Sequence, residues 1–158
     1  MSARSITVAL NCDKFISVND RLRKGGRGRN GRIPLTYAAE KEMSQLRRSL
    51  ELSGVPEGAM SGGKYYTVSL VFYLKENLSR RDLDNLIKTV FDVVGPYFGF
   101  DDRNIISYKA SKRQIKYPKG YPEPIEWLVL TVTDTDKQKS DLVINKEDFD
   151  KLILNKGE

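Results

Sequence analysis

The chain of 158 residues contains no histidine and a single cysteine, Cys12. One cysteine cannot form a disulfide within the chain, and without histidine it cannot complete a Cys-His zinc site or a Cys-His catalytic pair. The absence of histidine also excludes imidazole as a general base. Hydrolysis by this chain would therefore depend on carboxylates, on lysine or on water bound to a metal ion.

Long apolar runs are also lacking. No stretch approaches the roughly 18 consecutive apolar residues that indicate a membrane-spanning helix. The N-terminus has no apolar core of a signal peptide. We therefore expect a cytoplasmic protein without a membrane partner. The length fits one domain that is large enough to bury a core.

Positive charge exceeds negative charge, and the excess lies near the N-terminus. The net charge is +6, and residues 1–50 carry eleven basic against four acidic side chains. This balance favours a polyanionic partner such as DNA. Six cations in a glycine-rich stretch are interpreted as a loop that contacts DNA phosphates, with a merely solvated loop as the alternative. They are Arg21, Arg23, Lys24, Arg27, Arg29 and Arg32.

Apolar spacing predicts four strands and two main helices. The strands are predicted at residues 6–10, 65–74, 105–116 and 125–133. We expect the second of them to be central in the sheet, and we expect Trp127 to pack in the core.

The first helix is predicted to begin after Thr36 and to end before Gly54. The second is predicted over residues 83–94, ended by Gly95-Pro96. We therefore expect an α+β fold, in which a mixed sheet of about four strands packs against two main helices. It would form one small domain over residues 1–133. Residues 134–158 would form a C-terminal extension with a short helix docked on the core or on a partner.

Carboxylates and cations concentrate at the start of the second predicted helix. The sequence there reads Arg80-Arg81-Asp82-Leu83-Asp84-Asn85, followed by Lys88 and by the pair Asp101-Asp102. Carboxylates from a helix entrance and a strand edge suit Mg²⁺, which prefers oxygen ligands. The preceding arginines would attract a phosphodiester. The structural alternatives are that Asp82 caps the helix and that Asp84 forms an ordinary ion pair with Lys88.

These residues resemble the signature of a known family. The string Arg81-Asp82-Leu83-Asp84-Asn85-Leu86, with Lys88, Phe91, Asp92 and Gly99-Phe100-Asp101-Asp102, is similar to that of the RusA family of Holliday junction resolvases. These are endodeoxyribonucleases common in bacteria and prophages. The resemblance implies a homodimer that uses Mg²⁺ or Mn²⁺. It also implies that the substrate is branched DNA, a four-way junction that is resolved by paired symmetric nicks in recombination and repair.

The resemblance also implies roles for individual residues. Asp82, Asp84 and Asp102 correspond to the family's catalytic metal-binding carboxylates, and Lys88 corresponds to its catalytic lysine. Lys88 would place positive charge on the scissile phosphate. Asp101 is the alternative ligand to Asp102, because successive residues on a strand point to opposite faces. We favour Asp102.

The neighbouring residues have expected roles as well. Arg80 and Arg81 are expected to contact DNA. Asn85 would orient a ligating carboxylate or serve the first turn of the helix. We expect the tyrosines in the core or in turns, and none is assigned to base stacking.

Two other function classes stay open. One is a protein of the same fold that binds DNA junctions without cutting them, because Pro96 displaces the carboxylates. The other is a Mg²⁺-dependent phosphoesterase that uses Asp-x-Asp on small phosphates, in which case the basic loop is incidental.

Overall fold

The structure of the protein, a computed structural model, describes residues 3–12, 37–75, 78–120, 125–136 and 145–154. These residues form an α+β fold with a four-stranded mixed sheet and three α-helices, which confirms the predicted class. The strands are β1 (Ser5–Asn11), β2 (Tyr65–Leu74), β3 (Ile105–Gln114) and β4 (Trp127–Thr135). The helices are α1 (Tyr37–Leu52), α2 (Leu83–Phe98) and α3 (Lys146–Leu154), with short 3-10 helices η3 (Leu78–Arg80) and η4 (Asp102–Asn104).

The strands lie in the order β1-β4-β2-β3. β4 pairs antiparallel with both β1 and β2, whereas β2 and β3 are parallel. β2 is therefore central, as its dense β-branched and aromatic sequence predicts. A parallel pair requires a crossover connection, and α2 lies within the connection from β2 to β3.

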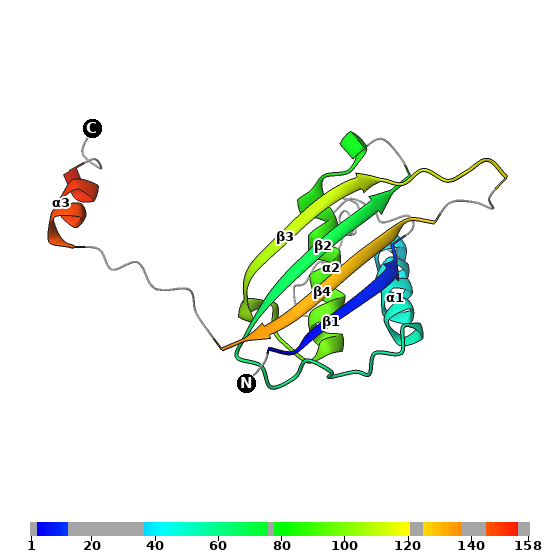
Figure 1. Ribbon diagram of the computed structural model, residues 1–158, viewed down its shortest axis with the longest axis horizontal. Helices are drawn as coiled ribbons and strands as arrows, with labels where there is room; N and C mark the ends of the chain where they lie inside the picture. The colour runs from blue at the N-terminus through cyan, green and yellow to red at the C-terminus, as the bar shows by residue number, and fades with distance from the viewer. Residues whose placement is uncertain (1–2, 13–36, 76–77, 121–124, 137–144, 155–158) are drawn as a thin grey trace.

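The helices α1 and α2 lie together against one face of the sheet (Figure 1). Because side chains alternate along a strand, every second residue points into the layer between sheet and helices. The buried residues of β2 and β4 are Tyr66, Val68, Leu70, Phe72, Leu74, Leu128, Leu130 and Val132. Leu46 and Leu50 of α1 are also fully buried, as the apolar spacing in that helix predicts. The prediction for Trp127 is wrong, since it alternates with Leu128 and is half-buried on the other face.

Helix α2 is longer than predicted. It continues to Phe98, so the prediction that Gly95-Pro96 ends it is wrong. Pro96 lies in the last turn, where its ring is exposed. The end is set by Gly99, which adopts the left-handed conformation (φ 89°, ψ 31°) and donates its N–H to the carbonyl of Gly95 at 2.9 Å. The N–H of Phe100 donates to the same carbonyl at 3.0 Å. A glycine just beyond the helix satisfies the last carbonyls in this way.

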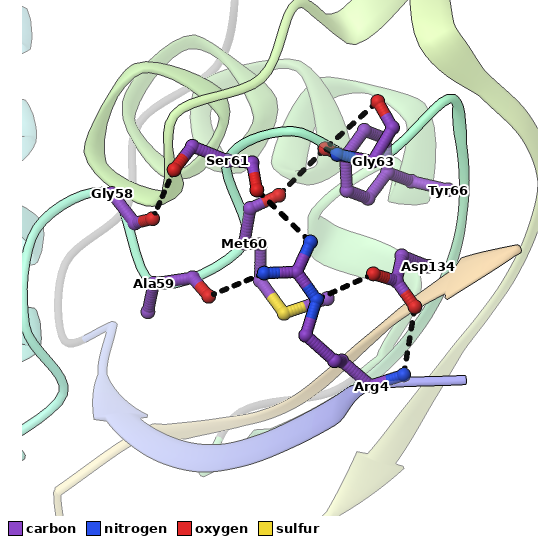
Figure 2. Close-up of polar contacts among 8 residues, drawn as sticks. All are labelled: Arg4, Gly58, Ala59, Met60, Ser61, Gly63, Tyr66 and Asp134. Atoms are coloured by element: carbon purple, nitrogen blue, oxygen red, sulfur yellow. Dashed lines mark hydrogen bonds and ion pairs between the residues drawn. The ribbon is translucent and has the colours of Figure 1, made fainter. Parts of the chain in front are cut away.

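Arg4, next to the start of β1, holds together the ends of two strands and a turn (Figure 2). Asp134 of β4 accepts hydrogen bonds from the backbone N–H of Arg4 at 2.7 Å and from its Nε at 2.6 Å. Arg4 Nη2 also donates to the carbonyl of Ser61 at 2.9 Å. The hydrogen bonds from Arg4 hold the pKa of Asp134 below its usual value.

The turn before β2 folds around the hydroxyl of Tyr66 (Figure 2). This hydroxyl donates to the carbonyl of Met60 at 2.6 Å and accepts the N–H of Gly63 at 2.9 Å. The ring of Tyr66 stacks on that of Phe100, with centroids 4.2 Å apart. Tyr66 therefore connects this turn with the segment that leads from α2 into β3.

The C-terminal segment contains a helix, α3, at residues where we expect one. The docking of this helix stays a prediction. No helix in the described part of the chain is both long enough and apolar enough to cross a membrane. The basic stretch from Arg21 to Arg32 lies outside the described residues, so its expected contact with DNA also stays a prediction.

Candidate active site along helix α2

Two aspartates stand at the beginning of α2. Asp82 occupies the N-cap position with an extended backbone (φ −72°, ψ 136°), but its side chain makes no capping hydrogen bond. Asp84 lies in the first turn, and both side chains are exposed, while the neighbouring Asn85 is half-buried. The positive end of the helix dipole partly offsets the repulsion between two negative groups here. The alternative in which the Asp82 carboxylate serves only as a cap is therefore not realised.

A charged stripe continues from Asp84 along α2. Lys88 is exposed one turn later, and within the described part of the chain no ion pair of 4.0 Å or less joins it to Asp84. Asp92 follows after one more turn and lies on the same side, because residues four apart are neighbours on a helix surface. We name Asp84, Lys88 and Asp92 the α2 stripe. Asp92 was not assigned a role from the sequence, although its spacing of four from Lys88 is a usable signal.

The far end of the α2 stripe meets a second acidic group. Asp92, Asp101 and Asp102 line an open depression of about 490 Å³, together with Phe91, Pro96, Gly99 and Phe100. The segment 100–102 lies close to the helix because Gly95 has no side chain. A Cβ on Gly95 would meet the carbonyl oxygen of Phe100 at 3.0 Å.

Asp101 is a turn residue in this second group. It caps η4: Oδ1 accepts the N–H of Arg103 at 2.9 Å, and Oδ2 accepts Nη2 of the same arginine at 2.8 Å. These hydrogen bonds hold the pKa of Asp101 well below its usual range, so the carboxyl is ionised at neutral pH. Its charge is thus already paired with Arg103. Asp102, in the first turn of η4, is exposed.

The two acidic groups lie at opposite ends of α2. Asp82 follows the C-terminal end of β2, and Asp102 precedes the N-terminal end of β3. Because these two strands are parallel, the two positions lie beyond opposite ends of the strands. The N–H of Asp102 lies beside Gly95, which is 13 positions after Asp82 and thus about 20 Å along the helix. In the described ranges, no three His, Cys, Asp or Glu side chains gather in a group that could hold one ion. One copy of the chain therefore does not bring Asp82, Asp84 and Asp102 together.

The guanidinium of Arg81 forms an ion pair with a buried acid. It contacts the carboxylate of Glu126, whose side chain is only 2% exposed. The N–H of Lys75 donates to the same oxygen at 3.1 Å. Glu126 neutralises the charge of Arg81 and fixes the chain before α2. The expected contact of Arg81 with DNA stays a prediction. The side chain of Arg80 lies outside the described residues.

Lys112 of β3 fixes the same connection. Its Nζ donates to the carbonyl of Leu78 and, at 2.7 Å, to the carbonyl of Arg81. Lys112 pairs in register with Phe72, so it points toward the helix layer. Lys112 and Glu126 are thus positioning residues that the sequence analysis missed. The usable signal was a lysine at a core-facing position of a strand.

The donor chemistry of the site suits Mg²⁺, although the number of donors at each end is small. Mg²⁺ is often held by one or two carboxylates, and substrate phosphates complete its ligand shell. Asp82 and Asp84 could form such a pair at one end of α2, and Asp102 could contribute at the other.

A scan against models of protein families and a search of curated proteins found no match to this chain. The RusA-like motif around α2 therefore stands as a resemblance, and the function that it implies is a proposal.

Proposed function

We propose that this chain is a Mg²⁺-dependent endonuclease that cuts branched DNA and resolves Holliday junctions by paired symmetric nicks. The observation that carries the proposal is that the carboxylates of Asp82 and Asp84 are exposed and, among the described residues, not occupied by a structural role. Neither capping by Asp82 nor an ion pair between Asp84 and Lys88 occupies these carboxylates in the described part of the chain. They are exposed beside a lysine, within a motif that resembles the RusA signature. The proposed substrate implies a cytoplasmic location.

In this proposal, the residues at the start of α2 have different roles. Asp82 and Asp84 would hold Mg²⁺, or Mn²⁺ in its place. When bound, the ion would supply an activated water and stabilise the leaving oxygen. Lys88 is exposed one turn beyond Asp84 and binds the scissile phosphate as negative charge develops on it. Asn85 orients a carboxylate from the first turn.

The proposed homodimer has a structural reason. Asp102 lies about 20 Å from Asp82 along α2, which is too far for both to bind one ion. A site with all three aspartates therefore requires Asp82 and Asp84 from one copy and Asp102 from another. Two such sites in a symmetric dimer would match paired nicks on a symmetric junction.

One observation favours the alternative of a junction-binding protein that does not cut. Because α2 separates Asp82 from Asp102, the described residues of one copy form no group of three His, Cys, Asp or Glu side chains that could hold one ion. A chain that does not dimerise in the required orientation would then bind DNA without hydrolysing it. Cleavage of a junction in the presence of Mg²⁺ distinguishes the endonuclease from the junction-binding protein.

The first test compares the full chain with Asp82→Asn on a labelled four-way junction and on a linear duplex of the same sequence. We expect symmetric nicks confined to the junction, which require Mg²⁺, disappear with EDTA and are lost in Asp82→Asn. Asp150→Asn, a matched change at an exposed position of α3, should cut like the wild type. Junction binding without nicks in Mg²⁺ or Mn²⁺ would overturn the enzymatic proposal.

A mixing experiment tests the shared site. Asp82→Asn and Asp102→Asn are each expected to be inactive alone. In a mixed dimer one of the two shared sites contains only unchanged aspartates, so mixing should restore single nicks. If each site belonged to one copy, mixing would restore nothing.

A further inference from the structure

The sheet has a second face, which lies opposite the layer of α1 and α2 (Figure 1). Alternation along β2 directs Tyr65, Thr67, Ser69, Val71 and Tyr73 to this side. We define the open face as these five residues with their register neighbours on β1, β4 and β3. None of the helices in the described ranges packs on it. The proposed nuclease site makes no use of this face.

Two rows of hydroxyl groups cross the open face. One row consists of Ser5, Thr133, Thr67 and Ser107. The next consists of Thr7, Thr131 and Ser69 and ends at the ammonium-bearing Lys109. The hydroxyls of Ser5 and Thr133 lie 3.0 Å apart, and those of Thr7 and Thr131 lie 2.9 Å apart. A depression of about 180 Å³ spans both rows, and Lys109 is part of its lining. Hydroxyl and ammonium groups are typical ligands of backbone phosphates.

An aromatic row lies further along the same face. Trp127 and Tyr73 are neighbours in register, and Arg113 follows beside Tyr73. Both aromatic side chains are half-buried, which leaves part of each accessible. Arg113 is four residues beyond Lys109, so the two cations stand about 13 Å apart along β3. Aromatic rings at a surface of this kind are platforms on which nucleic-acid bases stack.

The charge of the open face favours a polyanion over a second copy of the chain as the molecule that binds there. Lys109 and Arg113 are exposed, and the positions of the four strands that point to this side include no aspartate or glutamate. At the margin, the ammonium of Lys64 lies 5.4 Å from the ring centroid of Tyr65. A second copy placed face to face would oppose cations with cations or with neutral groups. A polyanion with stackable rings complements both the charges and the aromatic row.

We propose that the open face binds a single strand of nucleic acid. Trp127 and Tyr73 stack on bases, while Lys109, Arg113 and the hydroxyl rows contact phosphates. The binding is sequence-tolerant, because stacking and phosphate contacts read no base edges. It is independent of the proposed cleavage, since the acidic residues of α2 belong to the other layer.

Trp127 provides a direct readout, because it is the only tryptophan in the chain. Titration of the full chain with oligothymidylate of about 16 nucleotides in EDTA should quench its fluorescence to saturation. Asp82→Asn should show the same quenching, so that failure of the nuclease proposal is distinguishable from failure of this one. Absence of quenching would overturn the proposal. Quenching that grows with protein concentration without oligonucleotide would also overturn it, by indicating a second copy on the face.

A pair of matched double variants tests the cations by anisotropy of the labelled oligonucleotide. Lys109→Gln with Arg113→Gln should weaken binding at least about tenfold and reduce the slope of log affinity against log salt by about 1.4. Lys41→Gln with Arg48→Gln removes two exposed cations from α1 on the other layer and should change affinity far less. Equal losses in both double variants would overturn the assignment to the open face. Far-UV circular dichroism of both variants checks that the fold is retained.

Discussion

The guanidinium of Arg81 contacts the carboxylate of Glu126 where the chain enters α2, and the side chains of the two residues are 16% and 2% exposed. The N–H of Lys75, directly after β2, donates to the same carboxylate. Glu126, directly before β4, therefore links the end of β2 with the start of α2. The position of Asp82, adjacent to Arg81, depends on this link.

Glu126→Gln should lower the free energy of unfolding by about 3 kcal/mol, because removing one partner leaves the other charge uncompensated. Denaturant titration measures the loss. Glu147→Gln, which removes an exposed ion pair with Lys151 on α3, should change stability by less than about 1 kcal/mol. A similar small effect for both variants would show that the buried pair contributes little.

Gly95→Ala should destabilise the protein by about 1–2 kcal/mol, although alanine is the better helix former. The new Cβ would meet the carbonyl of Phe100 at 3.0 Å and push the segment with Asp102 away from α2. Thermal unfolding measures the stability, and amide chemical shifts of residues 101–103 report the displacement. Ser44→Ala, at an exposed position of α1, is the control for helix propensity. A gain in stability from Gly95→Ala would contradict the close approach.

Arg103→Gln should raise the pKa of Asp101 toward its ordinary value, because hydrogen bonds from Arg103 are the main cause of its depression. A lowered pKa in the folded state means that the stabilising contribution is present above the ordinary pKa. The contribution is lost as pH falls through the lower folded value. The stabilities of the wild type and of Arg103→Gln should therefore converge in acid.

Carboxyl NMR titration of Asp101 measures this shift directly. Lys109→Gln on β3 is the control and should leave the Asp101 titration unchanged. An ordinary pKa for Asp101 in the wild type would refute the interpretation.

Local patterns predicted the elements well because their signals lie within each segment. The bounds of β2 agree with those predicted, and the apolar stripe of α1 is buried as its spacing requires. The pair Gly95-Pro96 predicts too early an end for α2, because the cap at Gly99 sets the end and the last turn tolerates Pro96. Trp127 was misplaced because its side of the sheet follows from register, and not from its hydrophobicity.

The sequence by itself determined the types and order of the elements, the excess of positive charge, and the presence of aspartates and a lysine at the start of α2. Periodicity, capping and charge are local properties, so they can be read without a fold. Only the tertiary structure decided that Glu126 neutralises Arg81, that α2 separates Asp82 from Asp102, and that aromatic and basic side chains share the open face. These relationships join residues far apart in the chain, because strand register and helix length determine which side chains meet.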